Sequence, residues 1–258
     1  MKALILAAGY GTRLYPLTER IPKPLIEVSN KPIINYILEK LDPVENLDEV
    51  LIVTNNKFYA KFKDWADKLH GNFKNINLTI INDGTKSPED RLGAIGDINF
   101  VIENGALGNK DILVIGGDNL FDFGLDSFIK TARKNSPGAT IGLYDIKNKK
   151  EATRFGVLAI NQDNKIISFE EKPKDPRSSL IATCLYYFPK QTFSLFKEYI
   201  KDTGNNDTTG GYISWLYKKI AVYGYVFDGM WEDIGHIDSL CKLEEDYKKF
   251  IKEEKVER

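Results

Sequence analysis

Residues 3–14 read Ala-Leu-Ile-Leu-Ala-Ala-Gly-Tyr-Gly-Thr-Arg-Leu, an apolar run that ends in a loop with two glycines. The run is typical of a buried β-strand, and the glycines allow backbone amides to approach an anion without a side-chain clash. Successive N–H groups in such a turn form an anion-binding nest, to which Arg13 and Lys23 add positive charge. We therefore predict a strand that ends in a phosphate cradle.

The composition excludes several classes of protein. The 258 residues are 42% hydrophobic and 28% charged, which is ordinary for a globular protein. The net charge of −1 gives no electrostatic case for nucleic acid or a membrane surface. The first apolar stretch is interrupted too early for a signal peptide, and no run is long enough for a transmembrane helix. Because Cys184 and Cys241 fit neither a disulfide framework nor a metal motif, we expect a cytoplasmic protein.

Short apolar runs alternate with amphipathic stretches through the first half of the chain. They predict strands at residues 2–8, 50–54, 76–81 and 112–115, and helices at 32–41, 58–69 and 92–103. Such alternation implies right-handed crossovers and a largely parallel sheet. The predicted fold class is α/β, a Rossmann-like mixed, mainly parallel sheet flanked by helices.

The second half of the chain is richer in β-structure. Its pattern predicts strands at 140–144, 157–160, 166–170, 180–188 and 221–228, and helices at 190–199, at 212–218 and from 237 to the C-terminus. No internal repeat, low-complexity tract or long linker interrupts the chain. We therefore expect a single domain over residues 1–258.

The glycine loop fits neither of two common phosphate-binding motifs. No Gly-Lys-Ser/Thr follows it as in a Walker A loop, and Leu14 stands where a dinucleotide fingerprint has its third glycine. However, Gly-Tyr-Gly-Thr-Arg-Leu-Tyr-Pro-Leu-Thr at residues 9–18 is followed by Pro-Lys-Pro-Leu at 22–25. This combination resembles the signature of the sugar-1-phosphate nucleotidyltransferases, also called sugar-nucleotide pyrophosphorylases.

The resemblance implies a GT-A-like nucleotidyltransferase fold and a reaction in which an NTP and a sugar 1-phosphate give an NDP-sugar and pyrophosphate. The substrates that it favours are dTTP or UTP and glucose 1-phosphate. It divides the domain into a nucleotide-binding part over about residues 1–135, a small β-rich sugar-phosphate-binding part over about 136–236, and a C-terminal helix over 237–258. No covalent enzyme intermediate is needed, so the protein positions the substrates and neutralises their charge.

The resemblance also assigns roles in the first segment. Arg13 is expected to stabilise the leaving pyrophosphate, and Lys23 to reach the α-phosphate. The residues expected to cradle the phosphates are Ala8, Gly9, Gly11 and Thr12.

Two further segments carry candidate metal ligands. Gly-Gly-Asp-Asn at residues 116–119 follows an apolar strand, and Trp-Glu-Asp-Ile-Gly at 231–235 lies far along the chain. Taken alone, each is also typical of a turn or a helix cap. In the resembled family, Asp118 and Asp233 would together hold the catalytic Mg²⁺, an ion that prefers hard oxygen ligands.

The sugar side of the site is expected near Phe-Glu-Glu-Lys-Pro at residues 169–173. Composition alone favours a solvated strand end. In the resembled family, Glu171 accepts hydrogen bonds from sugar hydroxyls and Lys172 meets the sugar phosphate. Gly156 and Thr183 complete that pocket, although Cys184 stands where the family often has glycine.

The match to the family is weakest at residues 82–97, where the base should be read. Asn82 is expected to read the base through its amide, and Gly93 to let the ring approach the backbone. Alternatively, Arg91 and Asp97 form an exposed salt bridge across a helical turn, an interaction of small energy. The identity of the base therefore stays open.

Other functions remain open at this point. A transferase of the same fold would use phosphocholine or another phosphate alcohol, and a GT-A glycosyltransferase would use a nucleotide sugar as donor. A non-catalytic nucleotide-sensing subunit is a third alternative. Tyr212, Trp215 and Tyr217 are expected to pack within a helix, with a homo-oligomer contact as the other interpretation.

Overall fold

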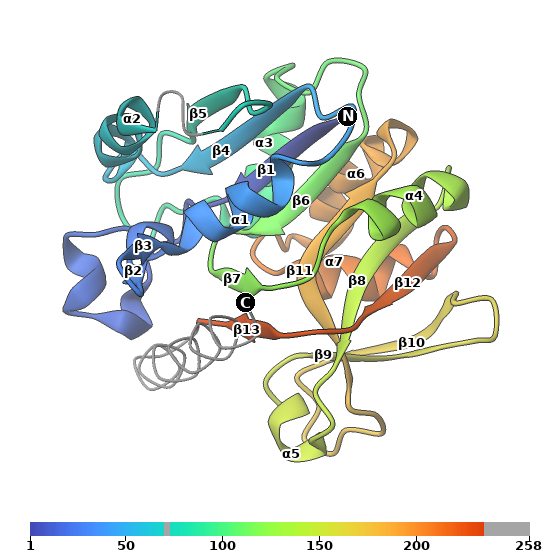
Figure 1. The fold of residues 1–258 in the computed structure, drawn as a ribbon. Coiled ribbons are helices and arrows are strands. Elements are labelled where there is room, and N and C mark those ends of the chain that lie inside the picture. The colour runs from blue at the N-terminus through green and yellow to red at the C-terminus, as the bar shows by residue number, and fades with distance from the viewer. Residues whose placement is uncertain (70–72, 235–258) are drawn as a thin grey trace, which may run out of the picture.

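The computed structural model describes residues 1–69 and 73–234, and a nine-stranded sheet forms its centre (Figure 1). Four parallel strands come from the first half of the chain, in the spatial order β5, β4, β1, β6. Their bounds are β1 Lys2–Leu6, β4 Glu49–Thr54, β5 Leu78–Asn82 and β6 Ile112–Gly116. Because parallel strands end at one edge of the sheet, the loops that follow them share that edge.

The second half of the chain extends the same sheet. Strand β11 pairs antiparallel with β6, β8 and β9, while β10 pairs with β9 and β12 runs parallel to β8. These strands are β8 Ala139–Asp145, β9 Gly156–Ile160, β10 Ile166–Glu171, β11 Leu180–Phe188 and β12 Val222–Phe227. The predicted α/β class with a mixed sheet is confirmed.

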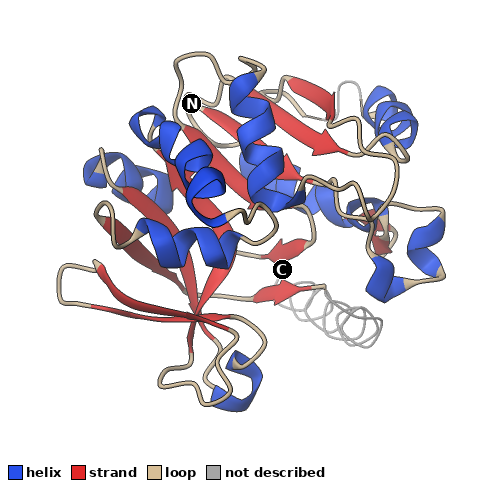
Figure 2. Ribbon diagram, turned by 180° about the vertical axis from the view of Figure 1, so that it is seen from behind, coloured by secondary structure: helices blue, strands red, loops and turns tan. Residues whose placement is uncertain are grey.

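Helices cover both faces of the sheet (Figures 1 and 2). Ala3 and Ile5 pack into one buried cluster and Leu4 into another, because successive strand residues point to opposite faces. The first cluster includes side chains from α1 Ile33–Leu41, α2 Tyr59–Lys68 and α4 Asp126–Asn135. The second includes side chains from α3 Gly93–Glu103, α6 Ser194–Thr203 and α7 Thr209–Leu216.

Several predicted bounds were wrong. The helix predicted at 190–199 is a short 3₁₀ turn, Lys190–Thr192, followed by α6, which ends where Gly204 takes a left-handed conformation. The helix predicted at 212–218 begins at Thr209, because the Thr208 side chain accepts the Gly211 N–H and caps it. Sequence reasoning missed α4 and the short α5 Lys149–Ala152. The helix predicted from residue 237 lies outside the described residues.

Two small ribbons lie outside the main sheet. The first pairs β2 Glu27–Val28 with β3 Lys31–Pro32. The second pairs β7 Asn119–Phe121 with β13 Trp231–Asp233, so two segments far apart in sequence lie side by side. This second ribbon matters for the site, because it carries Asp233 to the end of β6.

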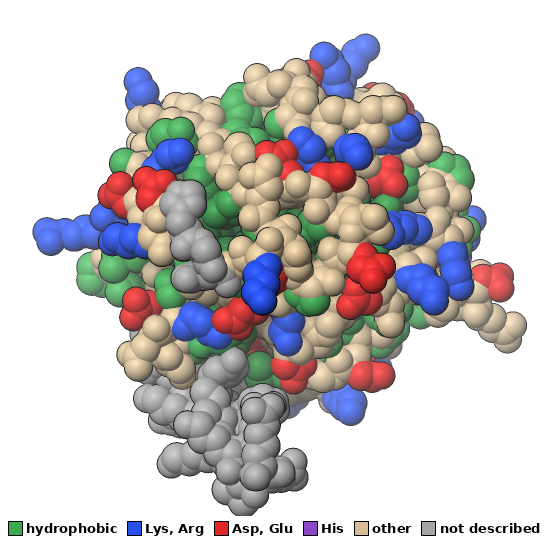
Figure 3. All heavy atoms as spheres, turned by 45° about the horizontal axis from the view of Figure 1, so that its top comes forward, with side chains coloured by type: hydrophobic (Ala, Val, Ile, Leu, Met, Phe, Trp, Pro, Cys, Tyr) green, Lys and Arg blue, Asp and Glu red, His purple; other side chains and the backbone are tan. Residues whose placement is uncertain are grey.

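The surface carries both signs of charge. On the face shown in Figure 3, the Lys and Arg side chains are interspersed with Asp and Glu. Within residues 1–69 and 73–234, none of the helices is both long enough and apolar enough to cross a membrane.

Candidate active site

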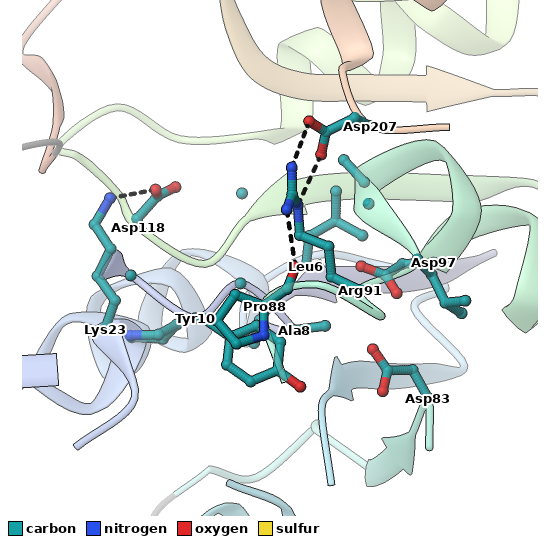
Figure 4. Close-up of a pocket in the computed structure, with 18 of the residues that line it drawn as sticks. Leu6, Ala8, Tyr10, Lys23, Asp83, Pro88, Arg91, Asp97, Asp118 and Asp207 are labelled. Atoms are coloured by element: carbon teal, nitrogen blue, oxygen red, sulfur yellow. Dashed lines mark hydrogen bonds and ion pairs between the residues drawn. The ribbon is translucent and has the colours of Figure 1, made fainter. Parts of the chain in front are cut away.

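A cavity of about 570 Å³ lies where β1 and β6 end (Figure 4). We call one side of it the loop end, formed by residues 9–13 with Lys23 and Asp118, and the other the acid end, formed by Asp83 and Asp97. Predicted nucleotide-site residues that line the cavity are Ala8, Gly9, Gly11, Thr12, Arg13 and Gly93. The structure therefore gathers most of that predicted set around one space.

The glycine loop is held by a local contact. Gly11 has a φ of 63°, and a Cβ there would lie 3.1 Å from the buried Thr18 side chain. The Thr18 hydroxyl donates to the Gly11 carbonyl at 2.7 Å. A Cβ on Gly9, in contrast, would meet no heavy atom within 4 Å. Packing therefore requires glycine at position 11, whereas at position 9 the space is left open.

Lys23, Asp118 and Asp233 form one charged group beside the loop end. The Lys23 ammonium pairs with Asp118, and its Nζ lies 3.8 Å from Oδ1 of Asp233. The β7–β13 ribbon sets this arrangement, because it places Asp233 opposite Asn119. The indole N–H of Trp231 donates to Oδ1 of Asn119 at 2.7 Å and ties the same two strands together.

The pKa values of the two carboxylates are shifted in opposite directions. Burial and then the negative charge of Asp118 raise the pKa of Asp233 to about 6. Burial also disfavours the charged form of Asp118, but the Lys23 ammonium outweighs it and the pKa of Asp118 is lowered. Near neutral pH both are therefore ionised, and with Lys23 they carry a net charge of −1.

This group suits a hard cation. Within the described part of the chain, no three or more Asp, Glu, His or Cys side chains cluster as a ready-made metal site. Asp118 and Asp233 supply two carboxylates, and Mg²⁺ is usually held by one or two carboxylates together with substrate phosphates. The donor set and the net negative charge fit such an ion.

The predicted sugar residues lie apart from this cavity. Glu171 ends β10 opposite Gly156 of β9, and Lys172 follows with its Nζ 3.9 Å from Oε1 of Glu171. A Cβ on Gly210 would lie 1.8 Å from Oε2 of Glu171, so this carboxylate rests against the first turn of α7. Burial raises the pKa of Glu171, and the charge of Lys172 offsets part of that effect.

Thr183 has a contact of its own. Its side chain is buried, and its hydroxyl donates to the Gly142 carbonyl at 2.9 Å. Among the described residues that line the cavity, none of the four predicted sugar residues appears. The structure thus brings Gly156, Glu171 and Lys172 together but engages Thr183 in strand packing.

Asn82 does not line the cavity, in contrast to the prediction. Its amide N–H donates to Oδ1 of Asn56 at 2.9 Å, and its oxygen accepts the Gly84 N–H at 2.9 Å. The next residue, Asp83, lines the cavity instead. Successive residues at the end of a strand point to opposite sides, so a shift of one residue exchanges which side chain faces the site.

Gly93 lines the cavity, but its conformation also serves packing. Its φ is 75°, and a Cβ there would lie 2.5 Å from the Cα of Asp207. The first free amides of α3 donate to the carbonyls of Asn206 and Asp207. Glycine at position 93 therefore lets the segment before α7 cap α3.

The alternative of an Arg91–Asp97 salt bridge is wrong. The Arg91 guanidinium instead pairs with Asp207, with its Nη2 3.1 Å from Oδ2 and its Nε 3.3 Å from Oδ1 (Figure 4). Asp97 is only 5% exposed and faces Asp83 at the acid end. The sequence signal that could have identified the acid end was Asp97, an acidic residue among the buried apolar residues of α3.

Comparison with known proteins identifies the family. The nucleotidyl transferase family matches residues 2–249. The bifunctional protein GlmU of Methanocaldococcus jannaschii is 33% identical over 237 residues, covering 91% of this chain and 51% of that protein. A glucose-1-phosphate thymidylyltransferase of Neisseria meningitidis is 34% identical over 201 residues, covering 77% of this chain and 65% of that protein. This chain thus spans about half the length of GlmU.

Solved structures agree in fold. A Bacillus anthracis protein assigned as a glucose-1-phosphate thymidylyltransferase, in complex with sucrose, superposes with a TM-score of 0.81 at 27% identity, covering 95% of this chain and 94% of that chain. A UDP-glucose pyrophosphorylase complexed with UDP-glucose gives a TM-score of 0.81 at 21% identity, with 96% and 98% covered, and shows the shared fold. As its motifs predict, this chain belongs to the nucleotidyl transferase family.

Proposed function

We propose that the protein transfers a nucleotidyl group from an NTP to a sugar 1-phosphate and releases pyrophosphate. The observation that carries the proposal is the convergence of the glycine loop and Arg13 with Lys23 and Asp118 around one cavity. The family assignment and the names of the relatives support it.

The reaction needs no covalent step on the protein. A phosphate oxygen of the sugar 1-phosphate attacks the α-phosphorus, a new P–O bond forms, and the bond to the pyrophosphate oxygen breaks. The loop amides and Arg13 hold the departing phosphates, and Lys23 neutralises charge at the α-phosphate. Positioning and preorganised charge are the main sources of catalysis in such transfers.

Asp118 and Asp233 would hold a Mg²⁺ ion, which the net charge and the two hard ligands of this group suit. When bound, the ion neutralises phosphate charge. The Lys23 ammonium pairs with Asp118 and lies 3.8 Å from Oδ1 of Asp233, so a single cation lies beside both carboxylates.

On the acceptor side, we assign Glu171 to the sugar hydroxyls and Lys172 to the sugar phosphate. A carboxylate accepts bidentate hydrogen bonds, and an exposed ammonium suits a phosphate. The names of the relatives support glucose 1-phosphate as acceptor and dTTP as donor. UTP is the second donor that the sequence motifs favour, so glucose 1-phosphate with dTTP and with UTP are the two reference pairs for a first assay.

A matrix of nucleotides against sugar 1-phosphates, with and without EDTA and with pyrophosphate release as readout, tests the proposal. We expect Mg²⁺-dependent release with at least one pair. A phosphocholine arm tests the competing acceptor class. Binding of nucleotide without release from any pair would support the sensing subunit and overturn the proposal.

A further inference from the structure

The Glu171 carboxylate packs against two glycines that come from different elements. Glu171 ends β10, and its side chain is 34% exposed. A Cβ on Gly210, in the first turn of α7, would lie 1.8 Å from Oε2, 2.6 Å from Cδ and 3.2 Å from Oε1 of this residue. A Cβ on Gly156, at the start of β9, would lie 3.2 Å from the same Oε2. The carboxylate therefore occupies the space that a side chain at position 210 would need.

Packing, and not hydrogen bonding, sets the position of this carboxylate. Among residues 1–69 and 73–234, its polar partner is Lys172 alone, whose Nζ lies 3.9 Å from Oε1. At that distance the two charges attract each other without forming a hydrogen bond. An ionised carboxylate can accept several hydrogen bonds. The oxygens of Glu171 therefore keep their capacity to accept them from a ligand.

The contact with Glu171 also explains why position 210 is glycine. Glycine is unfavourable in a helix, because it loses more backbone freedom on folding than alanine does. Gly210 does not have a positive φ, so its backbone conformation does not require glycine. The close approach of the carboxylate does require it, since a Cβ would take the place of Oε2.

Two contacts fix the first turn of α7 to the rest of the fold. The hydroxyl of Tyr186, a residue of β11 that is 3% exposed, donates to the Thr209 hydroxyl at 3.0 Å. The Thr208 hydroxyl accepts the Gly211 N–H at 3.4 Å and caps the helix. The surface against which Glu171 rests is thus held by the central sheet and by the helix cap.

We propose that Gly210 and the first turn of α7 are positioning elements of the acceptor site, which set where the Glu171 carboxylate lies and so determine how the protein discriminates among sugar hydroxyl groups. A methyl group at position 210 would displace the carboxylate, and hydrogen bonds weaken steeply when their geometry is lost. The inference rests on the proposed function, because it concerns the hydroxyl groups of a sugar 1-phosphate.

The first test is Gly210→Ala, assayed with the nucleotide and the sugar 1-phosphate that give most pyrophosphate. The KM for the sugar 1-phosphate should rise by about ten-fold, as for the loss of a hydrogen bond to a charged group, and the KM for the nucleotide should stay within about two-fold. The matched control is Gly124→Ala, whose added Cβ would meet no heavy atom within 4 Å, so neither KM should change. An unchanged KM for the sugar 1-phosphate, or an equal rise in both KM values, would overturn the inference.

Mono-deoxy analogues of the same sugar 1-phosphate test the discrimination among hydroxyl groups directly. With the wild-type protein, at least one analogue should have a KM about ten-fold above that of the parent sugar, because the carboxylate loses a donor. In Gly210→Ala this ratio should fall to within about two-fold, whereas Gly124→Ala should keep the wild-type ratio. A ratio that Gly210→Ala leaves unchanged, or a wild-type protein that uses every analogue equally well, would contradict the inference.

A shorter carboxylate tests whether Gly210 acts through Glu171. Glu171→Asp withdraws the oxygens from position 210, so it should relieve the clash that Gly210→Ala creates. In the double variant, the KM for the sugar 1-phosphate should lie at least about five-fold below the value expected if the two single effects multiplied. Effects that simply multiply would show that the two positions are independent and would rule the inference out.

The proposed function and this inference fail in different ways. No pyrophosphate from any substrate pair overturns the proposed function. Normal turnover with a KM for sugar 1-phosphate that Gly210→Ala leaves unchanged overturns only the role of α7. If Gly210→Ala does not fold, Tyr186→Phe removes the bond to Thr209 and should raise that KM alone by about three-fold. An unchanged KM in Tyr186→Phe would then overturn the inference.

Discussion

The carboxyl groups at the two ends of the cavity lie in opposite electrostatic environments. At the loop end, half-buried Asp118 and Asp233 share the Lys23 ammonium. At the acid end, Asp83 and Asp97 are almost fully buried, and neither has an ion-pair partner in the part of the chain that the structure describes. A carboxyl beside a cation favours its charged form, whereas burial without a cation favours the neutral form. The loop end is thus built to stay ionised and the acid end to hold a proton.

The largest expected effect is at the loop end. Asp118→Asn removes one of the two proposed metal ligands and the partner of Lys23, so we expect kcat to fall by about 10³-fold, or about 4 kcal/mol of transition-state stabilisation. Pyrophosphate release at saturating substrate measures it. Glu232→Gln, beside Asp233 in sequence, is the control and should keep most of the activity. Near-wild-type turnover in Asp118→Asn would show that the carboxylate pair is not part of the catalytic site.

The second expected effect is a pH dependence of protein stability that comes from Asp97 at the acid end. Between the ordinary value of 3.8 and the folded value of about 8, folded Asp97 holds a proton that the unfolded chain has released. Stability therefore falls as pH rises through this window. Since one pKa unit corresponds to about 1.4 kcal/mol, the free energy of unfolding should fall by about 2–3 kcal/mol from about pH 6 to about pH 8 through this residue.

Urea unfolding at a series of pH values checks this effect. Asp97→Asn lacks the titrating group, so its stability relative to wild type should increase as pH rises. Asp64→Asn, which makes the same change on the exposed face of α2, should follow the wild-type curve. If Asp97→Asn keeps the wild-type slope, then Asp97 is ionised in the folded protein and the contrast between the two ends fails.

Much of the loop end could be predicted from sequence because its contacts are local or lie at strand ends. The continuous apolar runs of β1 and β6 identify buried parallel strands, and the residues after them meet at one edge. The Gly11–Thr18 contact also joins residues close in sequence. Convergence of Asp118 with Asp233 followed from the family resemblance, whereas the β7–β13 ribbon that produces it was not predicted.

The acid end could not be predicted in the same way. Strand β5 ends at Asn82, one residue later than predicted, and the side chain that reaches the cavity is that of Asp83. The partner of Arg91 is Asp207, from the segment before α7, and no local spacing indicates that pairing. The placement of the residues at the acid end therefore depends on tertiary contacts that a single sequence does not display.

The third effect tests the acceptor side. Lys172 is 60% exposed and lies beside Glu171, outside the cavity. Lys172→Ala should raise the KM for sugar 1-phosphate by about ten-fold, the equivalent of one charge-assisted hydrogen bond, and leave the KM for nucleotide unchanged. Lys174→Ala, two residues further along the chain, is the matched control. Equal changes in both KM values would argue against a role confined to the sugar phosphate.

The smallest expected effect concerns the ion pair between Arg91, near the acid end, and Asp207, just before α7. Arg91 and Asp207 are each 50% exposed, so water and salt screen their pair despite its two-point geometry. A double-mutant cycle with Arg91→Ala and Asp207→Ala, measured by urea unfolding, should give a coupling of about 0.2–1 kcal/mol that shrinks in high salt.

The segment before α7 also caps α3 through the carbonyls of Asn206 and Asp207, which neither substitution removes. We therefore expect the pH dependence of stability that Asp97 produces to survive the loss of the pair, because Asp83 and Asp97 are held by burial and by Thr85. A coupling well above this range, or a loss of that pH dependence, would mean that the acid end is positioned from α7 across the exposed pair.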